Sequence, residues 1–119
     1  MTLEEYFSTG PGFERPVFDA VMAHLLTLGE PFLEPGSVGV FVKRSGVGVL
    51  QLRPMTKWVA LCLFMPRTVR DRRISRKPID SGRVVYHVVN VRGPDDVDDT
   101  VREWITEAWD LAGEGMRST

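Results

Sequence analysis

The side chains best suited to binding chemistry are six bases that follow the longest apolar run of the sequence. The run covers residues 58–65 and begins at Trp58, and Pro66 separates it from the bases. A single acid, Asp71, lies among them. Bases near an aromatic side chain suit single-stranded nucleic acid or another anion, and guanidinium groups suit the carboxylates of an acidic protein equally well. The six bases are Arg67, Arg70, Arg72, Arg73, Arg76 and Lys77.

Charge is strongly segregated along the chain, although the net charge is only −1. Residues 1–42 hold one base and six acids, residues 43–83 hold eleven bases and two acids, and residues 84–119 hold three bases and eight acids. Acidic helices can neutralise a basic sheet edge inside the molecule, or the bases can form a cationic surface for a partner. The pI is not basic, which favours internal neutralisation, because dedicated nucleic-acid binders are usually basic overall.

Residues with catalytic potential form no recognisable motif. Cys62 lies inside the apolar run, where a thiol is usually inert. The serines lack the Gly-x-Ser-x-Gly context of a hydrolase nucleophile. The two histidines, His24 and His87, are far apart in sequence, and His87 is the better candidate for a functional role. We therefore predict no catalytic residue, and keep a small-molecule-binding domain or enzyme with His87 in a pocket as the alternative.

Metal and phosphate sites are also poorly supported by the sequence. The acidic cluster Asp95, Asp96, Asp98 and Asp99 has no EF-hand spacing. It is explained by a helix N-terminus, which carries a partial positive charge. The segment Gly46-Val47-Gly48 falls in a predicted hairpin and not between a strand and a helix, where phosphates are usually bound. We predict no metal and no cofactor.

Three helices are predicted from capping signals and apolar spacing. Residues 2–5 form a capping box for a short first helix. A second helix is expected over residues 14–28, because apolar side chains recur at helical spacing and Gly29 ends the pattern. A third begins at Pro94 and continues to Gly113, followed by a frayed tail over residues 114–119.

Four short strands are predicted between the second and third helices. They cover residues 38–43, 47–53, 58–65 and 83–92, while residues 31–36 form a connector and residues 67–82 are irregular. Short links between successive strands indicate an antiparallel meander. The sequence therefore predicts a single α+β domain over residues 1–119, in the order α-α-β-β-β-β-α, with the helices mainly on one face of a four-stranded sheet.

Alternation along the strands predicts which side chains face the helices. In the central strand, Leu61 and the residues two positions away should point to the helices, and Trp58, Ala60, Cys62 and Phe64 to the opposite face. In the last strand, His87 should point inward, and Tyr86, Val88, Asn90 and Arg92 outward. The outward face mixes aromatic, small and basic residues. Such a patch can mark a partner or ligand site, or the loop from Met65 to Arg76 can fold over it and form a second small core.

The setting suggested by the sequence is the cytoplasm. A single cysteine excludes a disulfide within the chain and is most simply explained by a reducing compartment. The acidic start, residues 1–6, does not resemble a signal peptide. No stretch reaches the length of a membrane span, so we expect no membrane partner.

Six segments spread over most of the chain carry a recognisable pattern: Val40–Arg44, Leu52–Pro54, Lys57–Trp58, Phe64–Arg67, Arg73–Ile74 and His87–Asp98. Together they resemble a known bacterial family, the domain of unknown function 5655. The resemblance runs from Leu3 to about Ala112 and departs from the family pattern at Gly48 and Leu50, where a bulkier pair is expected. It implies a small cytosolic bacterial domain and carries no catalytic residue or cofactor.

The function most consistent with these observations is a non-enzymatic binding or interaction domain with a cationic, partly aromatic surface. The expected partner is anionic: nucleic acid or an acidic protein. A homodimer, in which the acidic helix of one subunit meets the basic loop of another, is a further possibility. The candidate partner-binding residues are Lys43, Arg44, Arg53, Lys57, Trp58, Arg67, Arg70, Arg72, Arg73 and His87.

Overall fold

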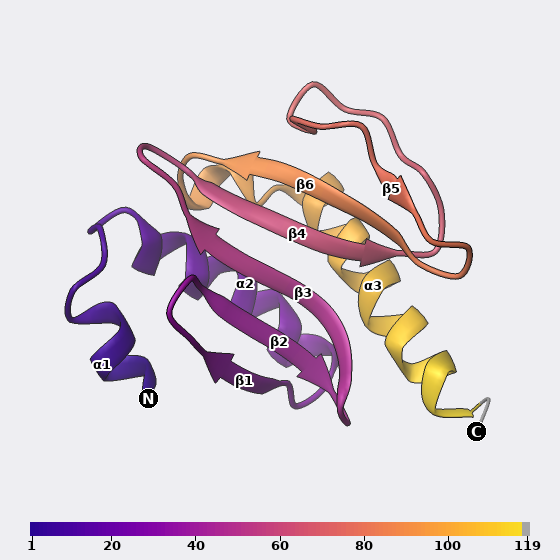
Figure 1. Cartoon of the computed structure of the whole chain (residues 1–119), viewed down its shortest axis with the longest axis horizontal. Coiled ribbons are helices and arrows are strands. Elements are labelled where there is room, and N and C mark those ends of the chain that lie inside the picture. Colours follow the sequence, from indigo (N-terminus) through magenta and orange to yellow (C-terminus); the bar gives the residue numbers. More distant parts are fainter. Residues whose placement is uncertain (118–119) are drawn as a thin grey trace.

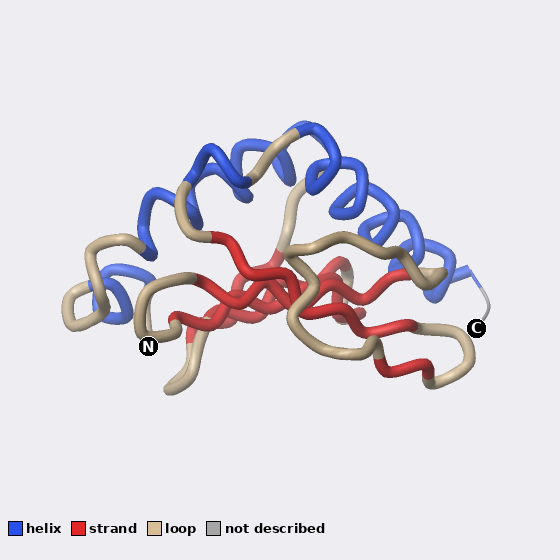
Figure 2. Tube along the Cα trace, turned by 90° about the horizontal axis from the view of Figure 1, so that it is seen from above, coloured by secondary structure: helices blue, strands red, loops and turns tan. Residues whose placement is uncertain are grey.

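In the computed structural model, which describes residues 1–117, one antiparallel sheet is covered on one face by helices. Figure 1 shows helices α2 (Glu14–Leu28) and α3 (Asp99–Arg117) crossing behind the strands, and Figure 2 shows both on the same side of the sheet. The short helix α1 (Leu3–Phe7) lies at the N-terminal end of the molecule. The α+β class and the one-sided arrangement of helices are therefore confirmed.

The sheet contains six strands rather than the four predicted. The strands are β1 (Phe32–Pro35), β2 (Val40–Arg44), β3 (Val47–Pro54), β4 (Val59–Met65), β5 (Ile79–Asp80) and β6 (Val85–Val91), in the spatial order β1-β2-β3-β4-β6-β5. The two unpredicted strands, β1 and β5, are the edges. Proline at both ends of β1 is compatible with an edge strand, where one row of amides needs no partner. The β5 strand is only two residues long, too short for alternation to reveal it.

The helix boundaries follow local capping chemistry. The Thr2 hydroxyl accepts a hydrogen bond from the Glu5 amide at 3.1 Å and caps the start of α1, as predicted. The helix predicted to start at Pro94 is instead divided into a 3-10 turn, η1 (Pro94–Asp96), and α3. Between the two, the backbone of Val97 is not helical. The Asp98 carboxylate then caps α3 by accepting a hydrogen bond from the Val101 amide at 3.0 Å. The α3 helix reaches Arg117, and residues 118–119 of the predicted tail lie outside the described residues.

The core lies between the helices and the inner face of the sheet. Strand β4 is central, and its Leu61 faces Leu52 of β3 on one side and Val89 of β6 on the other. All three side chains are buried. The α2 and α3 helices contribute apolar stripes that pack on this surface, among them Val21 and Ile105. The predicted facing of the central strand is confirmed.

The opposite face of the sheet carries a row of three aromatic rings. Phe41, Phe64 and Tyr86 meet edge to face, with ring centroids 5.6 and 4.9 Å apart. Gly48 of β3 lies in the middle of this row, and a Cβ atom at Gly48 would approach the Phe64 ring to 2.5 Å. The departure from a bulky residue at position 48 is thus explained by the Phe64 ring, which fills the space of the missing side chain.

The segment between β4 and β6 runs along the edge of β6. Ser75 donates its amide to the Val88 carbonyl, and Asn90 donates its amide to the Arg73 carbonyl. Ile74 forms a bridge with Val89. Figure 1 shows this segment beyond β6, at the side of the sheet. The segment therefore extends the sheet, and most of the aromatic face is left without a helix over it.

Candidate functional site on the helix-free face of the sheet

A hollow of about 300 Å³ lies on the helix-free face, over strands β3, β4 and β6. Two rows of paired residues cross it, since Cys62 of β4 pairs with Gln51 and Val88, and Ala60 pairs with Arg53 and Asn90. Small side chains on the central strand and longer ones on both neighbours make the surface concave. The lining consists of Gln51, Arg53, Met55, Trp58, Ala60, Cys62, Ser75, Arg76, Val88 and Asn90.

The chemistry of the hollow favours an anion with a flat apolar part. Arg53 and Arg76 supply guanidinium donors, and none of the ten lining residues is acidic. The amides of Gln51 and Asn90 can both donate and accept hydrogen bonds. Trp58 adds an indole ring, and the Arg92 guanidinium lies 5.9 Å from its centroid. Aromatic and basic groups are thus combined in one concave surface.

The thiol in this hollow is not set up as a nucleophile. Burial raises the pKa of Cys62, and the nearby Arg53 charge offsets only part of that effect. The thiol is therefore protonated at neutral pH, whereas thiolate is the nucleophilic form. Cys62 contributes shape and polarisability to the floor of the hollow, next to Ala60.

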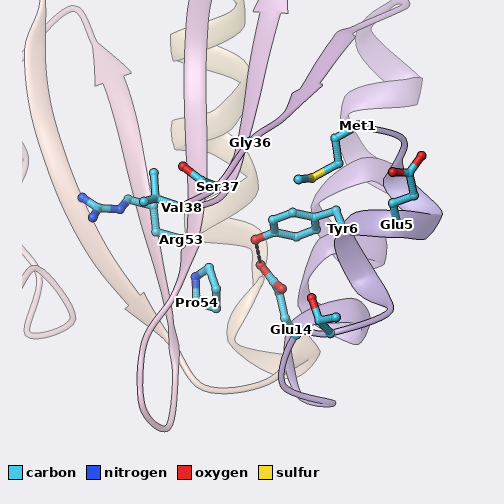
Figure 3. A pocket seen from close by; sticks show the side chains of 11 residues that line it. Met1, Glu5, Tyr6, Glu14, Gly36, Ser37, Val38, Arg53 and Pro54 are labelled. Atoms are coloured by element: carbon cyan, nitrogen blue, oxygen red, sulfur yellow. Dashed lines mark hydrogen bonds between the residues drawn. The ribbon is translucent and has the colours of Figure 1, made fainter.

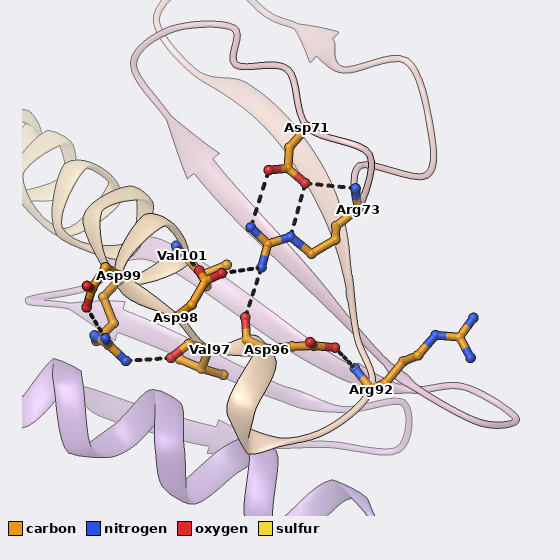
Figure 4. A network of polar contacts seen from close by, with 9 residues as sticks. Asp71, Arg73, Arg92, Asp96, Val97, Asp98, Asp99 and Val101 are labelled. Atoms are coloured by element: carbon orange, nitrogen blue, oxygen red, sulfur yellow. Dashed lines mark hydrogen bonds and ion pairs between the residues drawn. The ribbon is translucent and has the colours of Figure 1, made fainter.

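Two of the six bases between residues 67 and 77 are neutralised inside the molecule. The Arg67 guanidinium makes two hydrogen bonds to Glu107 of α3, at 2.8 and 3.0 Å. Figure 4 shows Arg73 between two carboxylates, with hydrogen bonds to Asp71 and Asp98 at 3.0 Å each. For Arg67 and Arg73, therefore, the positive charge is neutralised by acidic residues of the same chain, as one interpretation of the charge pattern predicted.

The other four bases of this segment are exposed. Arg72 lies near Asp71, whose pKa it helps to lower. Arg70, Arg76 and Lys77 form no ion pair with any residue in the range 1–117. Cationic groups thus remain at the surface after internal pairing, and Arg76 is the one that lines the hollow.

The candidate bases outside this segment have different surroundings. Lys43 pairs with Glu34 of the edge strand at 3.0 Å. The Arg44 guanidinium donates to the Trp109 carbonyl at 3.0 Å and lies over the Trp109 indole ring. Arg44 therefore connects the β2–β3 hairpin to α3. Lys57 is exposed in the turn before β4. Of these four predicted bases, only Arg53 lines the hollow.

His87 is fully buried on the inner face of β6. The Val69 amide donates to its Nε2 at 3.0 Å, so that nitrogen carries no proton. Its Nδ1 lies 3.2 Å from the Val85 carbonyl, which identifies Nδ1 as the donor. Both ring nitrogens are satisfied by the backbone, and the ring ties the start of the β4–β6 segment to the core. This geometry gives no support to an enzyme built around His87.

The structure brings together Arg53 and Trp58, which were predicted as site residues, with Arg76 of the basic segment, which was not among the candidate partner-binding residues. Three polar residues without a predicted role join them: Gln51, Ser75 and Asn90. Alternation along β3 and β6 already placed residues such as Asn90 on the outer face. Ser75 and Arg76 depend on the path of an irregular segment, which alternation does not predict.

Other classes of site find little support in residues 1–117. No group of three or more His, Cys, Asp or Glu side chains is arranged to hold a metal ion in that part of the chain. None of its helices is both long enough and apolar enough to cross a membrane.

Comparison with known proteins identifies a family. No curated protein matches the chain, and no solved structure does. A family model described as "Domain of unknown function (DUF5655)" matches residues 3–112, which is nearly the whole chain and agrees with the resemblance of the sequence segments. The chain belongs to the DUF5655 family.

Proposed function

We propose that this domain is a binding module that takes single-stranded nucleic acid on the helix-free face of its sheet. The observation that carries the proposal is the hollow over β3, β4 and β6, which combines Trp58 with Arg53 and Arg76 and contains no carboxylate. Stacking of bases on aromatic side chains, together with cationic groups for the backbone, is the usual basis of single-strand binding.

The size of the hollow supports a single planar group as its occupant. A volume of about 300 Å³ is at the small end of the range for small-molecule pockets, about 300–1,000 Å³. One base can occupy it while the adjacent phosphates meet guanidinium groups at its rim. The exposed bases Arg70, Arg72 and Lys77 extend the cationic character along the β4–β6 segment.

An acidic protein surface and a second copy of this chain are the alternative partners. Exposed guanidinium groups suit bidentate binding of carboxylates, which supports the protein partner. Arg67 and Arg73 form ion pairs within the chain, so less positive charge remains on the basic segment to hold a second copy of the chain in a homodimer. A cytoplasmic setting fits the proposal, because a single free cysteine is most simply explained by a reducing compartment.

The proposal predicts salt-dependent binding of an oligothymidylate that depends on Arg53 and Arg76. Neutralised phosphates release counterions, with a slope of about −0.7 in log K against log salt per contact on single strands. The Arg53→Ala/Arg76→Ala variant should bind more weakly and lose about 1.4 from the magnitude of that slope, one increment for each base. Fluorescence anisotropy of a labelled oligothymidylate and a matched duplex across a salt series measures both quantities.

The matched control is Arg15→Ala, which removes an exposed guanidinium from helix α2, on the other side of the sheet. Binding by this variant should equal that of the unmodified chain. Equal weakening by Arg15→Ala and by the double variant would show that the oligonucleotide is attracted by overall charge, and would contradict binding in the hollow. Absence of binding at low salt would exclude nucleic acid.

A further inference from the structure

A second cavity contains a buried carboxyl group with a free oxygen. Glu14, the first residue of α2, is only 1% exposed. The Tyr6 hydroxyl donates to its Oε2 at 2.5 Å. Its Oε1 is buried and has no hydrogen-bond partner among the described residues. A buried polar atom without a partner destabilises the folded chain, more so if the group is charged, and Oε1 is therefore an acceptor that a ligand could satisfy.

The cavity around Glu14 has about 430 Å³ and lies on the side of the molecule where α1 meets the sheet. Its walls come from α1, the α1–α2 connection, the β1–β2 loop around Ser37 and the end of β3. Figure 3 shows the Glu14 carboxyl group and the Tyr6 ring meeting in the middle of these walls. Arg53 is the one arginine or lysine in the lining, and its guanidinium points away from Tyr6 and Glu14.

The charge state of Glu14 depends on its surroundings. Burial raises the pKa of Glu14 above its ordinary value, and the hydrogen bond from Tyr6 offsets only part of that effect. An O–H···O separation of 2.5 Å is typical of a hydroxyl that donates to a carboxylate. A buried carboxylate is stabilised most by a positive group that also donates a hydrogen bond. Oε1 is the acceptor that such a group would use.

We propose that this cavity binds a small primary ammonium ion, which donates an N–H to Glu14 Oε1. The Tyr6 ring forms an adjacent wall and can stabilise the positive charge through its π face. The Glu5 carboxylate also lines the cavity and adds a second negative group. The ligand is therefore opposite in charge to the anion proposed for the helix-free face, and this site does not depend on that function.

An organic ammonium ion fits this lining better than a metal ion. Hard cations such as Ca²⁺ take six or more oxygen ligands, and residues 1–117 hold no group of three metal-binding side chains. An ammonium group has three N–H donors and can use separate carboxylate acceptors, here Glu14 and Glu5, beside the aromatic ring of Tyr6. The side chains of Met1 and Val38 supply apolar surface in the same cavity.

The test is a titration with n-butylammonium chloride, followed by amide NMR shifts of Gly10 and Ser37, which line the cavity. Saturable shifts are expected for the unmodified chain. Tetramethylammonium, which has the charge but no N–H, and n-butanol, which has no charge, should shift these amides at least tenfold less at the same concentration. The Glu14→Gln variant keeps the shape of the side chain and removes its charge, and should weaken binding at least tenfold.

The control variant Glu5→Gln removes the other carboxylate of the cavity and should weaken binding by less than Glu14→Gln. Circular dichroism verifies that both variants are folded. Three results would overturn the proposal: no saturable shift with n-butylammonium, equal binding of tetramethylammonium, or unchanged binding by folded Glu14→Gln. Arg53 lines both cavities, but the nucleic-acid test varies Arg53 and Arg76 and this test varies Glu14 and Glu5, so failure of either proposal leaves the other one standing.

Discussion

Replacing Leu61 with alanine is expected to lower the free energy of unfolding by about 2–5 kcal/mol, as buried large-to-small substitutions do. Leu61 is completely buried at the centre of β4, between Leu52 and Val89. The shortened side chain leaves a cavity, because hydrogen-bonded strands on both sides prevent the sheet from collapsing into it. Urea denaturation, with the midpoint and slope measured together, determines the change.

Its neighbour Cys62 is the matched control, since it belongs to the same strand but faces the helix-free side and is only partly buried. The Cys62→Ser change should cost clearly less than Leu61→Ala. If the two substitutions had equal effects, the assignment of opposite faces to residues 61 and 62 would be wrong.

Replacing Arg73 with alanine should have the second-largest effect, a loss of about 1–3 kcal/mol, because hydrogen bonds to charged groups are worth more than neutral ones. The guanidinium joins three segments: Asp71, the Asp98 carboxylate at the start of α3, and the Asp96 carbonyl in η1. Its removal leaves Asp98 without its ion pair and leaves Asp71 with only the smaller influence of Arg72. Both ion pairs are partly exposed to solvent, which weakens them, so the loss in the free energy of unfolding should not exceed the upper end of this range.

The Arg73→Ala variant should also lose part of its pH dependence. Hydrogen bonds from Arg73 lower the pKa of Asp71 below its ordinary value of 3.8. At Asp98, burial acts to raise the pKa, but the Val101 amide and Arg73 outweigh it, and the pKa is again lowered. Stability from these groups is therefore present above their unfolded pKa and disappears as the pH falls through the folded values.

Thermal denaturation at neutral pH and near pH 3 compares the two conditions for the Arg73 variant and its control, Arg70→Ala. Arg70 is exposed and unpaired within residues 1–117, so its removal should change stability by no more than about 0.5 kcal/mol. Equal loss in both variants at neutral pH would contradict the network shown in Figure 4.

Periodicity was sufficient to predict the parts of the fold that depend on burial. The bounds of α2 match the predicted residues 14–28, because its apolar stripe, its first-turn proline and Gly29 all agree. The facing of β4 and β6 was also predicted correctly, since one row of each strand is fully buried. In these segments a single physical requirement, an apolar surface toward the helices, determines the pattern.

Edge strands and irregular segments could not be predicted in the same way. The β1 strand ends in Pro35 and follows Pro31, and proline normally argues against a strand. The strand forms because an edge can do without some amide donors. The pairing of Arg73 with Asp98 joins residues 25 positions apart, and no local pattern indicates it. The charge blocks predicted attraction between segments, but not which arginines would pair.

The candidate site was predicted in part. Alternation indicated an outward surface with Trp58 and Cys62, whereas the hollow arises from the register between β3, β4 and β6. The buried Glu14 escaped prediction, because a glutamate in the first turn of a helix is ordinarily exposed and stabilised by the helix dipole. Its burial results from tertiary contacts between α1 and the start of α2, where the Tyr6 hydroxyl donates to Glu14 and the Phe7 ring meets Phe18.

The most direct test of the proposed function is an amide NMR titration of the whole chain with a short oligothymidylate at low salt. We expect saturable shifts at the Trp58 indole and at the amides of Gln51, Cys62 and Asn90, while amides in the middle of α2 remain unchanged. Shifts centred on the helices, or none at any concentration, would contradict binding on the helix-free face.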